Sequence, residues 1–277
     1  MLVNRLALTD DRDGFQPHMT EQRLAFDQVA DVYRSARPGY PEALIEDVVS
    51  FAALKQDDRV LEIGCGTGQA TKSFARRGVF IVAIDPGPEM IRAARGSLAD
   101  VPNVEFVEAT FEAWPATRGE FRLIVAAQSW HWVAHEVRFV KAAEVLSPGG
   151  SLAVFGHVPV GLPPALLDRF RETYLRQTGA WEPPAEAWYL PTGPFKGWFD
   201  QSGLFGPVAH KRYSWKWRHT TLSYTDFLRT RSDHRMMEPA KREDIIHEVA
   251  RAIDDHGGAF AADYETHLYI ARCLDRA

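Results

Sequence analysis

The sequence predicts an α/β protein built on a doubly wound, mostly parallel sheet. Four short apolar runs, at residues 60–63, 79–84, 121–127 and 151–155, are nearly continuous rather than alternating. Strands buried on both faces have this pattern, because helices cover both sides of a parallel sheet. The intervening segments are long enough for crossover helices, so strand and helix alternate along the chain.

The crossover segments 69–77, 89–98 and 136–146 carry apolar residues at three- and four-residue spacing, which is typical of helices with one buried face. A fainter strand is expected at residues 104–107. No segment of 20 to 50 residues repeats along the chain, which excludes solenoids and propellers.

Two further helices are expected ahead of the first strand, at residues 23–35 and 41–54. Pro38 and Pro41 separate them, because proline lacks the amide donor and restricts the residue before it. Residues 1–20 are expected to be a disordered leader, and residues 21–157 are expected to form the α/β core with its N-terminal helices.

The composition changes after Phe155. Eight of the 17 prolines fall within residues 158–207, and we interpret 158–206 as an inserted, irregular lid or cap. Within 207–277, the alternation over residues 210–220 predicts an amphipathic strand with one aromatic face. A helix that starts at a capping box on Ser223, a helix over 240–253 and a strand over 264–273 then complete the sheet.

Charge and cysteine content exclude several classes of protein. The 32 Lys and Arg against 37 Asp and Glu give a net charge of -5, so no overall field attracts nucleic acid or an anionic membrane. Cys65 and Cys273 form no disulfide framework and have no metal-ligand spacing. No run approaches the roughly 20 apolar residues of a membrane span. We expect a cytoplasmic protein with no metal, nucleic-acid or membrane partner; its oligomeric state stays open.

A glycine-rich loop between strand and helix is the strongest signal. Residues 60–63 lead directly into Gly64, Gly66 and Gly68. Glycine is needed where the backbone turns sharply and a ligand lies against it. Asp85 ends the next strand, 17 residues after Gly68, where a carboxylate can accept both hydroxyls of a ribose. The pattern predicts an adenosine-containing cofactor at the carboxyl edge of the sheet.

The glycine spacing discriminates between cofactors. A dinucleotide fingerprint requires G-x-G-x-x-G. If it starts at Gly64, its third glycine position holds Gln69, and if it starts at Gly66, that position holds Thr71. A nicotinamide-dependent oxidoreductase is therefore the first alternative function. A non-catalytic sensor module that keeps the cofactor fold is the second.

The form E-x-G-x-G-x-G, with Glu62 ahead of the glycines, resembles motif I of the class I S-adenosylmethionine-dependent methyltransferases. Residues 26–41, with Tyr33 and Arg37, the segment 126–132 and the run 146–150 resemble the methyltransferase type 11 group. Within that group the sequence is similar to trans-aconitate-methyltransferase-like members. The resemblance covers residues 22–156 and implies a Rossmann-like fold and an enzyme that uses S-adenosylmethionine.

The resemblance also implies roles for single residues. Gly64, Gly66 and Gly68 would wrap the methionine part of the cofactor, Glu62 would orient the loop, and Asp85 would hold the ribose. The remaining cofactor contacts would come from Met90, Thr110, Phe111, Gln128, Tyr33 and Arg37. Thr110 departs from the family, which usually has Asp there, so the adenine contact is expected to pass to the backbone of Phe111. Arg37 would pair with the cofactor carboxylate.

The acceptor is expected to be a small molecule that is methylated on oxygen, either a hydroxyl or a carboxyl group. Seven of the eight tryptophans and nine of the ten histidines lie at or beyond Trp130. The second half of the chain is therefore expected to build the acceptor pocket, with Trp130 and Trp132 as substrate contacts. His131 is the candidate for a general base or a positioning residue, and a structural role as a helix cap is the alternative.

Overall fold

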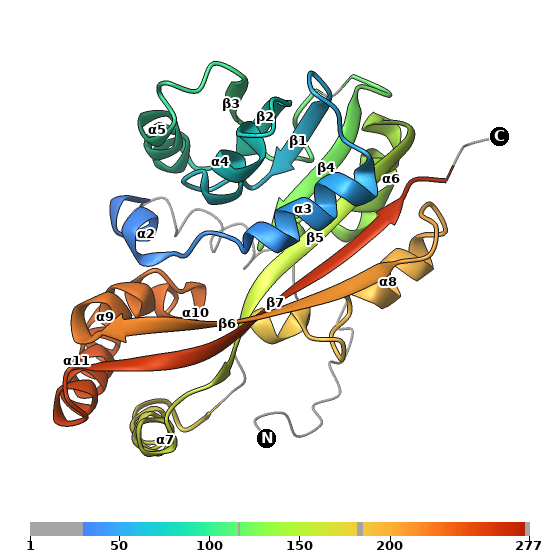
Figure 1. Ribbon diagram of the computed structural model, residues 1–277. Coiled ribbons are helices and arrows are strands. Elements are labelled where there is room, and N and C mark those ends of the chain that lie inside the picture. The colour runs from blue at the N-terminus through green and yellow to red at the C-terminus, as the bar shows by residue number, and fades with distance from the viewer. Residues whose placement is uncertain (1–29, 116, 182–184, 275–277) are drawn as a thin grey trace. The chain divides into compact units, whose positions relative to one another are not determined.

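The computed structural model describes residues 30–115, 117–181 and 185–274 (Figure 1). The expected leader 1–20 and residues 23–29 of the first expected helix lie outside the described residues. The chain divides into two compact units. We call Pro38–His157, Trp188–Tyr213 and the residues from Thr266 onward the glycine-loop unit. The α11 unit contains the described residues up to Arg37, those of Val158–Ala187, and Ser214–Glu265.

Seven strands form a sheet in the order β3-β2-β1-β4-β5-β7-β6. The pairs β1–β2, β1–β4, β2–β3 and β4–β5 are parallel, which confirms the predicted fold class. The strand order reverses at β1, and ligands of open α/β sheets bind outside the carboxyl ends of the strands at such a point. The strands are β1 (Arg59–Ile63), β2 (Phe80–Asp85), β3 (Val104–Glu108), β4 (Phe121–Ala127), β5 (Leu146–Gly161), β6 (Ala209–Thr220) and β7 (Ala259–Arg272).

The expected crossover helices are present with ends shifted by one or two residues. The α-helices are α2 (Ala30–Ala36), α3 (Glu42–Ala52), α4 (Gln69–Ala75), α5 (Pro88–Ser97), α6 (His135–Val145), α7 (Pro164–Thr178), α8 (Phe195–Ser202), α9 (Thr221–Arg229), α10 (Ser232–Arg235) and α11 (Pro239–Asp255). Short 3-10 helices are η2 (Trp130–Trp132) and η3 (Ala185–Tyr189).

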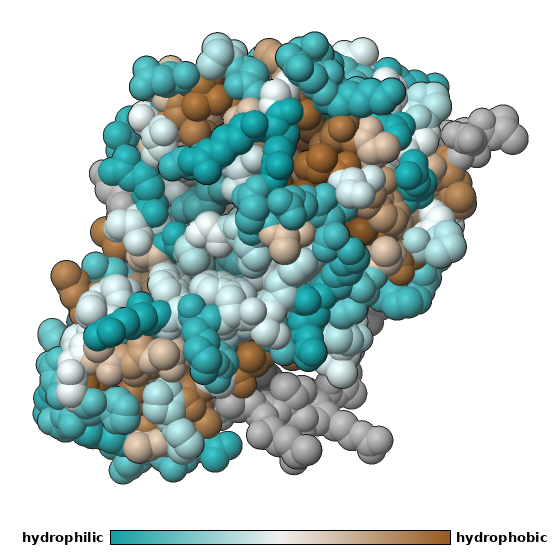
Figure 2. Space-filling view, viewed as in Figure 1, coloured by the Kyte–Doolittle hydropathy of each residue, from teal (hydrophilic) through white to brown (hydrophobic). Residues whose placement is uncertain are grey.

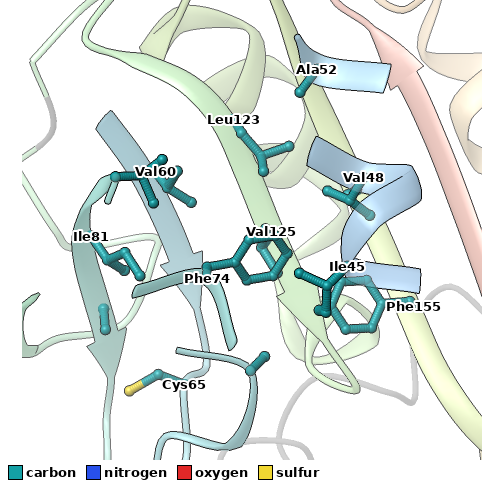
Figure 3. Close-up of a cluster of buried hydrophobic side chains, with 14 of the residues drawn as sticks. Ile45, Val48, Ala52, Val60, Cys65, Phe74, Ile81, Leu123, Val125 and Phe155 are labelled. Atoms are coloured by element: carbon teal, nitrogen blue, oxygen red, sulfur yellow. The ribbon is translucent and has the colours of Figure 1, made fainter. Parts of the chain in front are cut away.

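Helices α3 and α4 bury their apolar faces against the strands of the glycine-loop unit (Figure 3). Ile45 and Val48 of α3 and Phe74 of α4 are at most 1% exposed and meet strand residues such as Val125 and Phe155. Burying an aliphatic or aromatic side chain of this size contributes about 1.5–3 kcal/mol. The cluster fixes the helix that follows the glycine loop against the sheet that carries the loop.

The interpretation of 158–206 as an irregular segment is wrong in its local structure, because most of the segment is helical. Pro163 is the N-cap of α7 and Pro164 its first residue, while Pro194 is the N-cap of α8. Proline fits the first turn of a helix, where its missing amide has no intrahelical partner. These prolines begin helices rather than interrupt them.

The predicted strand over 210–220 is confirmed, but the predicted cap of the next helix is wrong by one turn. Trp215 and Trp217 are half-buried and His219 is buried, whereas the alternating positions 214, 216 and 218 are exposed. Thr220 is the N-cap of α9 and Ser223 is its third residue; each hydroxyl accepts a hydrogen bond from the backbone N–H of the other residue. Ser223 therefore completes the capping box from inside the helix.

The α11 unit has its own hydrophobic core. Ile245, Val249 and Ile253 of α11 are buried against Phe170 of α7 and Phe227 of α9. The stripe predicted on the helix over 240–253 is thus the buried face of α11. In the view of Figure 2 most of the surface is hydrophilic, with hydrophobic residues in separate groups. None of the described helices is both long enough and apolar enough to cross a membrane.

Candidate functional site

The glycine loop runs from the end of β1 into α4 with its three glycines in left-handed conformations. Their φ angles are 67° at Gly64, 55° at Gly66 and 89° at Gly68. The amides of Gly64 and Cys65 donate to the carbonyl of Ile84 on β2, over 2.8 and 3.0 Å. The loop is therefore held by the neighbouring strand in a conformation that L residues rarely adopt. The Cys65 thiol is buried, and burial raises its pKa.

The segment after β4 approaches the loop so closely that position 64 has no room for a side chain. A Cβ on Gly64 would lie 2.5 Å from the Cβ of Ser129. The Ser129 hydroxyl donates to the carbonyl of Ile63 at the end of β1. This contact brings the residues after β4 to the glycine loop at the reversal point of the sheet.

Asp85 ends β2 with both carboxylate oxygens held by backbone amides. Oδ2 accepts from the amide of Gly66 over 2.9 Å, and Oδ1 accepts from the amide of Gly87 over 2.9 Å. An ionised carboxylate can accept about four hydrogen bonds, which is more than the two that these amides donate. Asp85 thus links the glycine loop to the start of α5 and presents a half-buried carboxylate at the carboxyl edge of the sheet.

Glu62 lies on β1, only 1% exposed. Burial raises its pKa to about 8; the negative charge of Asp85 acts in the same direction, and hydrogen bonds from Thr71 oppose it. Oε2 of Glu62 has no hydrogen-bond partner among the described residues. A buried polar atom left in this way is costly, and a ligand's donor beside the loop would remove that cost.

The raised pKa of Glu62 predicts how stability depends on pH. The folded protein keeps this proton up to about pH 8, whereas the unfolded chain releases it near the ordinary value of 4.5. Between these values the folded state binds more protons, so the contribution of Glu62 to the free energy of unfolding falls as pH rises. Urea unfolding from pH 5 to 8.5 should show the wild type losing stability relative to Glu62→Gln.

The exposed Glu172→Gln serves as the matched control, because it makes the same substitution at a solvent-exposed position of α7. Its stability difference from the wild type should stay constant over this pH range. If the difference in the free energy of unfolding between Glu62→Gln and the wild type is also independent of pH, the raised pKa of Glu62 is contradicted.

The residues assigned to the adenine side lie on α5 and after β3. Met90 is 3% exposed on α5, and Phe111 is 2% exposed. The Thr110 hydroxyl accepts from the amide of Ala113 over 3.2 Å, and the Thr110 carbonyl accepts from the amide of Trp114. Thr110 thus shapes the turn at the place where the family has Asp. The amide of Ala109 donates to the Asp85 carbonyl, which ties this turn to β2.

The segment after β4 carries four of the predicted residues. Gln128 is half-buried and has a φ of 57°, which is uncommon for a residue other than glycine and is typical of functional sites. Trp130 is completely buried, with its ring against Phe139. His131 and Trp132 are half-buried, with ring centroids 4.7 Å apart. Of the two tryptophans assigned to substrate, Trp130 therefore occupies a core position and Trp132 the more accessible one.

Tyr33 and Arg37 belong to the α11 unit. The Arg37 guanidinium donates to the hydroxyl and the carbonyl of Thr230 over 3.1 and 2.9 Å. It also lies over the rings of Tyr33 and Phe227, at 4.9 and 4.8 Å. The structure thus pairs Tyr33 of α2 with Arg37, the residue after that helix, and holds Arg37 against Phe227 of α9.

Sequence reasoning missed three contributors to this site. Ser129 sets the size limit at Gly64, and the Gly87 amide holds Asp85. Tyr189, from η3, has its hydroxyl 3.4 Å from Nδ1 of His131. Ser129 lies inside the 126–132 motif, so the sequence could have marked it as a site residue. Tyr189 lies 58 residues after His131 with no motif around it, so no sequence signal marked it.

The sheet order, with the glycine loop after β1 and the acid at the end of β2, is that of the Rossmann-like fold of class I methyltransferases. Residues 60–150 match the family model described as a methyltransferase domain. A structure described as a type II methyltransferase from Anaeromyxobacter dehalogenans has the same fold, with a TM-score of 0.62 over 87% of this chain and 99% of that chain at 21% identity.

Two curated relatives match less than half of the chain. An uncharacterized methyltransferase of Mycobacterium tuberculosis is 34% identical over 134 residues, which are 48% of this chain and 52% of the relative. A trans-aconitate 2-methyltransferase of Paracidovorax citrulli is 34% identical over 112 residues, 39% of this chain and 42% of that protein. The chain spans about half the length of the curated relatives it matches.

Proposed function

We propose that the protein transfers a methyl group from S-adenosylmethionine to an oxygen atom of a small molecule. The observation that supports this best is Asp85, whose carboxylate is oriented by Gly66 and Gly87 beside a loop of three left-handed glycines. A carboxylate held in this way can accept hydrogen bonds from the hydroxyls of a ribose. The unpartnered Oε2 of Glu62 also fits a cofactor that lies against the loop.

In this proposal each residue has a defined task toward the cofactor. Asp85 accepts from the ribose hydroxyls, and the glycine loop lies along the methionine part, with Glu62 fixing the loop. Met90 and Phe111 supply the apolar contacts to adenine, and the Phe111 backbone replaces the missing family Asp. Gln128 is assigned to the methionine end. When bound, the cofactor supplies a methyl group on a sulfonium cation.

The protein's part in the reaction is then to hold the acceptor in line with that methyl group and to exclude water. Aromatic faces attract cations and keep a site dry. Trp132 and Trp188 flank His131, with ring centroids 4.7 and 5.9 Å from the imidazole. These residues are our candidates for the wall of the acceptor site.

Calorimetric titration with S-adenosylmethionine, S-adenosylhomocysteine and NAD tests the proposal without any acceptor. Binding of the first two alone supports it and excludes the nicotinamide alternative. Binding of NAD alone overturns it. Formation of S-adenosylhomocysteine with any acceptor excludes a non-catalytic sensor.

Replacement of His131 tests its role in the reaction. If His131 is a general base, His131→Ala should lower kcat by roughly 10² or more, because general acid–base catalysis contributes about that factor. The measurement is the formation of S-adenosylhomocysteine at saturating acceptor. A loss below about tenfold would assign His131 to positioning alone.

A further inference from the structure

Two carboxylates of the α11 unit share one guanidinium. Arg231, the N-cap of α10, donates from Nε and Nη2 to the two oxygens of Asp233, over 3.1 and 2.8 Å. Its Nη1 donates to Oε1 of Glu186, on η3, over 3.2 Å. The side chains of Arg231 and Glu186 are only 10% and 15% exposed. When His234 is neutral, the cluster holds one positive and two negative charges, so one negative charge is left uncompensated.

The two carboxylates differ in how well their oxygens are satisfied. Each oxygen of Asp233 accepts from Arg231, and Oδ1 also accepts from the amide and Nδ1 of His234, over 2.8 and 2.9 Å. Oε2 of Glu186 is buried and has no hydrogen-bond partner among the described residues. A buried charged oxygen without a donor is costly, and a ligand that brings a donor removes this cost. The missing donor and the uncompensated charge thus point to Glu186.

Two phenol groups of the α11 unit lie near Glu186. Burial raises the pKa of Tyr224, on α9, to about 12, and the negative charge of Glu186 acts in the same direction. Burial also raises the pKa of Tyr264, on β7, again with a contribution from Glu186. Arg37 has the opposite effect on Tyr264, but its Nε and Nη2 donate to Thr230. Both phenols therefore stay protonated at neutral pH, and their oxygens can accept hydrogen bonds.

Other aromatic rings hold these two phenols in place. The Tyr264 ring stacks on Trp215 with centroids 4.9 Å apart, and the Tyr224 ring stacks on Phe170 at 5.5 Å. Aromatic faces attract cations, so the surroundings of Glu186 favour a positively charged ligand. The side chain of Asp233 is 46% exposed, so the cluster reaches solvent on that side and a small ligand can approach it.

A protonated primary amine supplies what this cluster lacks. It carries one positive charge and three N–H donors, and it can donate to Oε2 of Glu186 and to the two phenol oxygens. We propose that the α11 unit holds a binding site for a primary ammonium group, formed by Glu186, Tyr224 and Tyr264. Binding of an amine at this site requires neither S-adenosylmethionine nor methyl transfer, so it goes beyond the proposed function.

Three probes with the same benzyl group separate charge from hydrogen bonding. Benzylammonium has both, benzyltrimethylammonium has the charge but no N–H donor, and benzyl alcohol has a donor but no charge. The affinities are measured at pH 7 and constant ionic strength by NMR titration of protein with labelled tyrosine rings. We expect benzylammonium to bind at least about tenfold more tightly than either of the others. If the alcohol or the quaternary ammonium binds equally well, or benzylammonium does not bind, the amine site is refuted.

Replacement of Glu186 tests whether this residue forms the site. Glu186→Gln should weaken binding of benzylammonium at least about tenfold. Glu172→Gln, at a position of α7 where the side chain is 77% exposed, is the matched control and should keep the wild-type affinity. Tyr264→Phe leaves the ion pair of Glu186 intact and should weaken binding about threefold or more. Wild-type affinity in Glu186→Gln overturns the proposal; if that variant does not fold, wild-type affinity in Tyr264→Phe does so.

S-adenosylhomocysteine carries a primary ammonium of its own, so the titration is repeated with this compound present. An unchanged affinity for benzylammonium supports a separate amine ligand. Competition between the two compounds would assign the site to the cofactor and overturn a separate ligand. Failure of S-adenosylhomocysteine to bind at all would refute the proposed function and leave the amine site standing.

Discussion

Asp85→Asn is expected to weaken binding of S-adenosylhomocysteine by about 100-fold. A hydrogen bond to a charged group contributes about 1.5–3 kcal/mol, and each 1.4 kcal/mol corresponds to tenfold in affinity. The substitution preserves size but removes the charge and one accepting oxygen. Because Oδ2 and Oδ1 also hold the amides of Gly66 and Gly87, the loop loses part of its support as well. Calorimetric titration measures the change in Kd.

Asp47→Asn is the matched control for this substitution. Asp47 lies on α3 of the same unit, where hydrogen bonds from Lys211 and Tyr213 lower its pKa. Its replacement removes one negative charge at a place with no assigned role in binding. Equal affinities of the two variants, with circular dichroism showing both folded, would refute the ribose assignment of Asp85.

Gly64→Ala is expected to lower the free energy of unfolding by roughly 3 kcal/mol and to abolish cofactor binding. A left-handed residue with a Cβ costs about 1–2 kcal/mol, and forcing an extra carbon into a packed site costs about 1–3 kcal/mol. The new Cβ would lie 2.5 Å from that of Ser129, so one of the two segments must move. Thermal unfolding should show a fall in Tm of roughly 6–12 °C.

Gly119→Ala separates backbone strain from the steric clash. Gly119 has a similar φ of 70°, and a Cβ there would meet nothing within 4 Å. Gly119→Ala should therefore lower the free energy of unfolding only by the cost of a left-handed backbone, about 1–2 kcal/mol. In the double variant with Ser129→Gly, the destabilisation should be smaller than the sum of the single effects. Equal destabilisation of Gly64→Ala and Gly119→Ala would show that Ser129 does not limit position 64.

The strands and helices around the glycine loop were predictable because their signals are local. The run from Val60 to Gly68 contains strand, turn and helix start in one segment, and the structure has each where the sequence predicts it. The strand over 151–155 was predicted too short, since β5 begins at Leu146. Residues 147–150 lie at a register shift in the β4–β5 pairing, between Phe121 and Leu123, so the strand starts before the apolar run that predicted it.

The candidate acceptor site was less predictable because its contacts are not local. Tyr189 meets His131 only through the packing of η3 and α8, and no periodicity marks that contact. The prolines of residues 158–206 led to a wrong prediction of irregular structure for a related reason. A proline such as Pro164 or Pro194 contributes equally to the composition whether it breaks a helix or begins one. Only the conformation of the residues that follow it distinguishes the two cases.

The glycine loop takes its shape from residues that the ribosome adds after it. The amides of Gly64 and Cys65 donate to the carbonyl of Ile84, some 20 residues further along the chain. Ser129, some 65 residues further along, fills the space beside Gly64. Contacts between residues so far apart in sequence form slowly, after the long intervening segment has been ordered. A nascent chain that stops before Ser129 thus lacks a finished loop. If the proposed function holds, S-adenosylmethionine can stabilise only chains that have passed this point, because a ligand that binds the folded state stabilises that state alone.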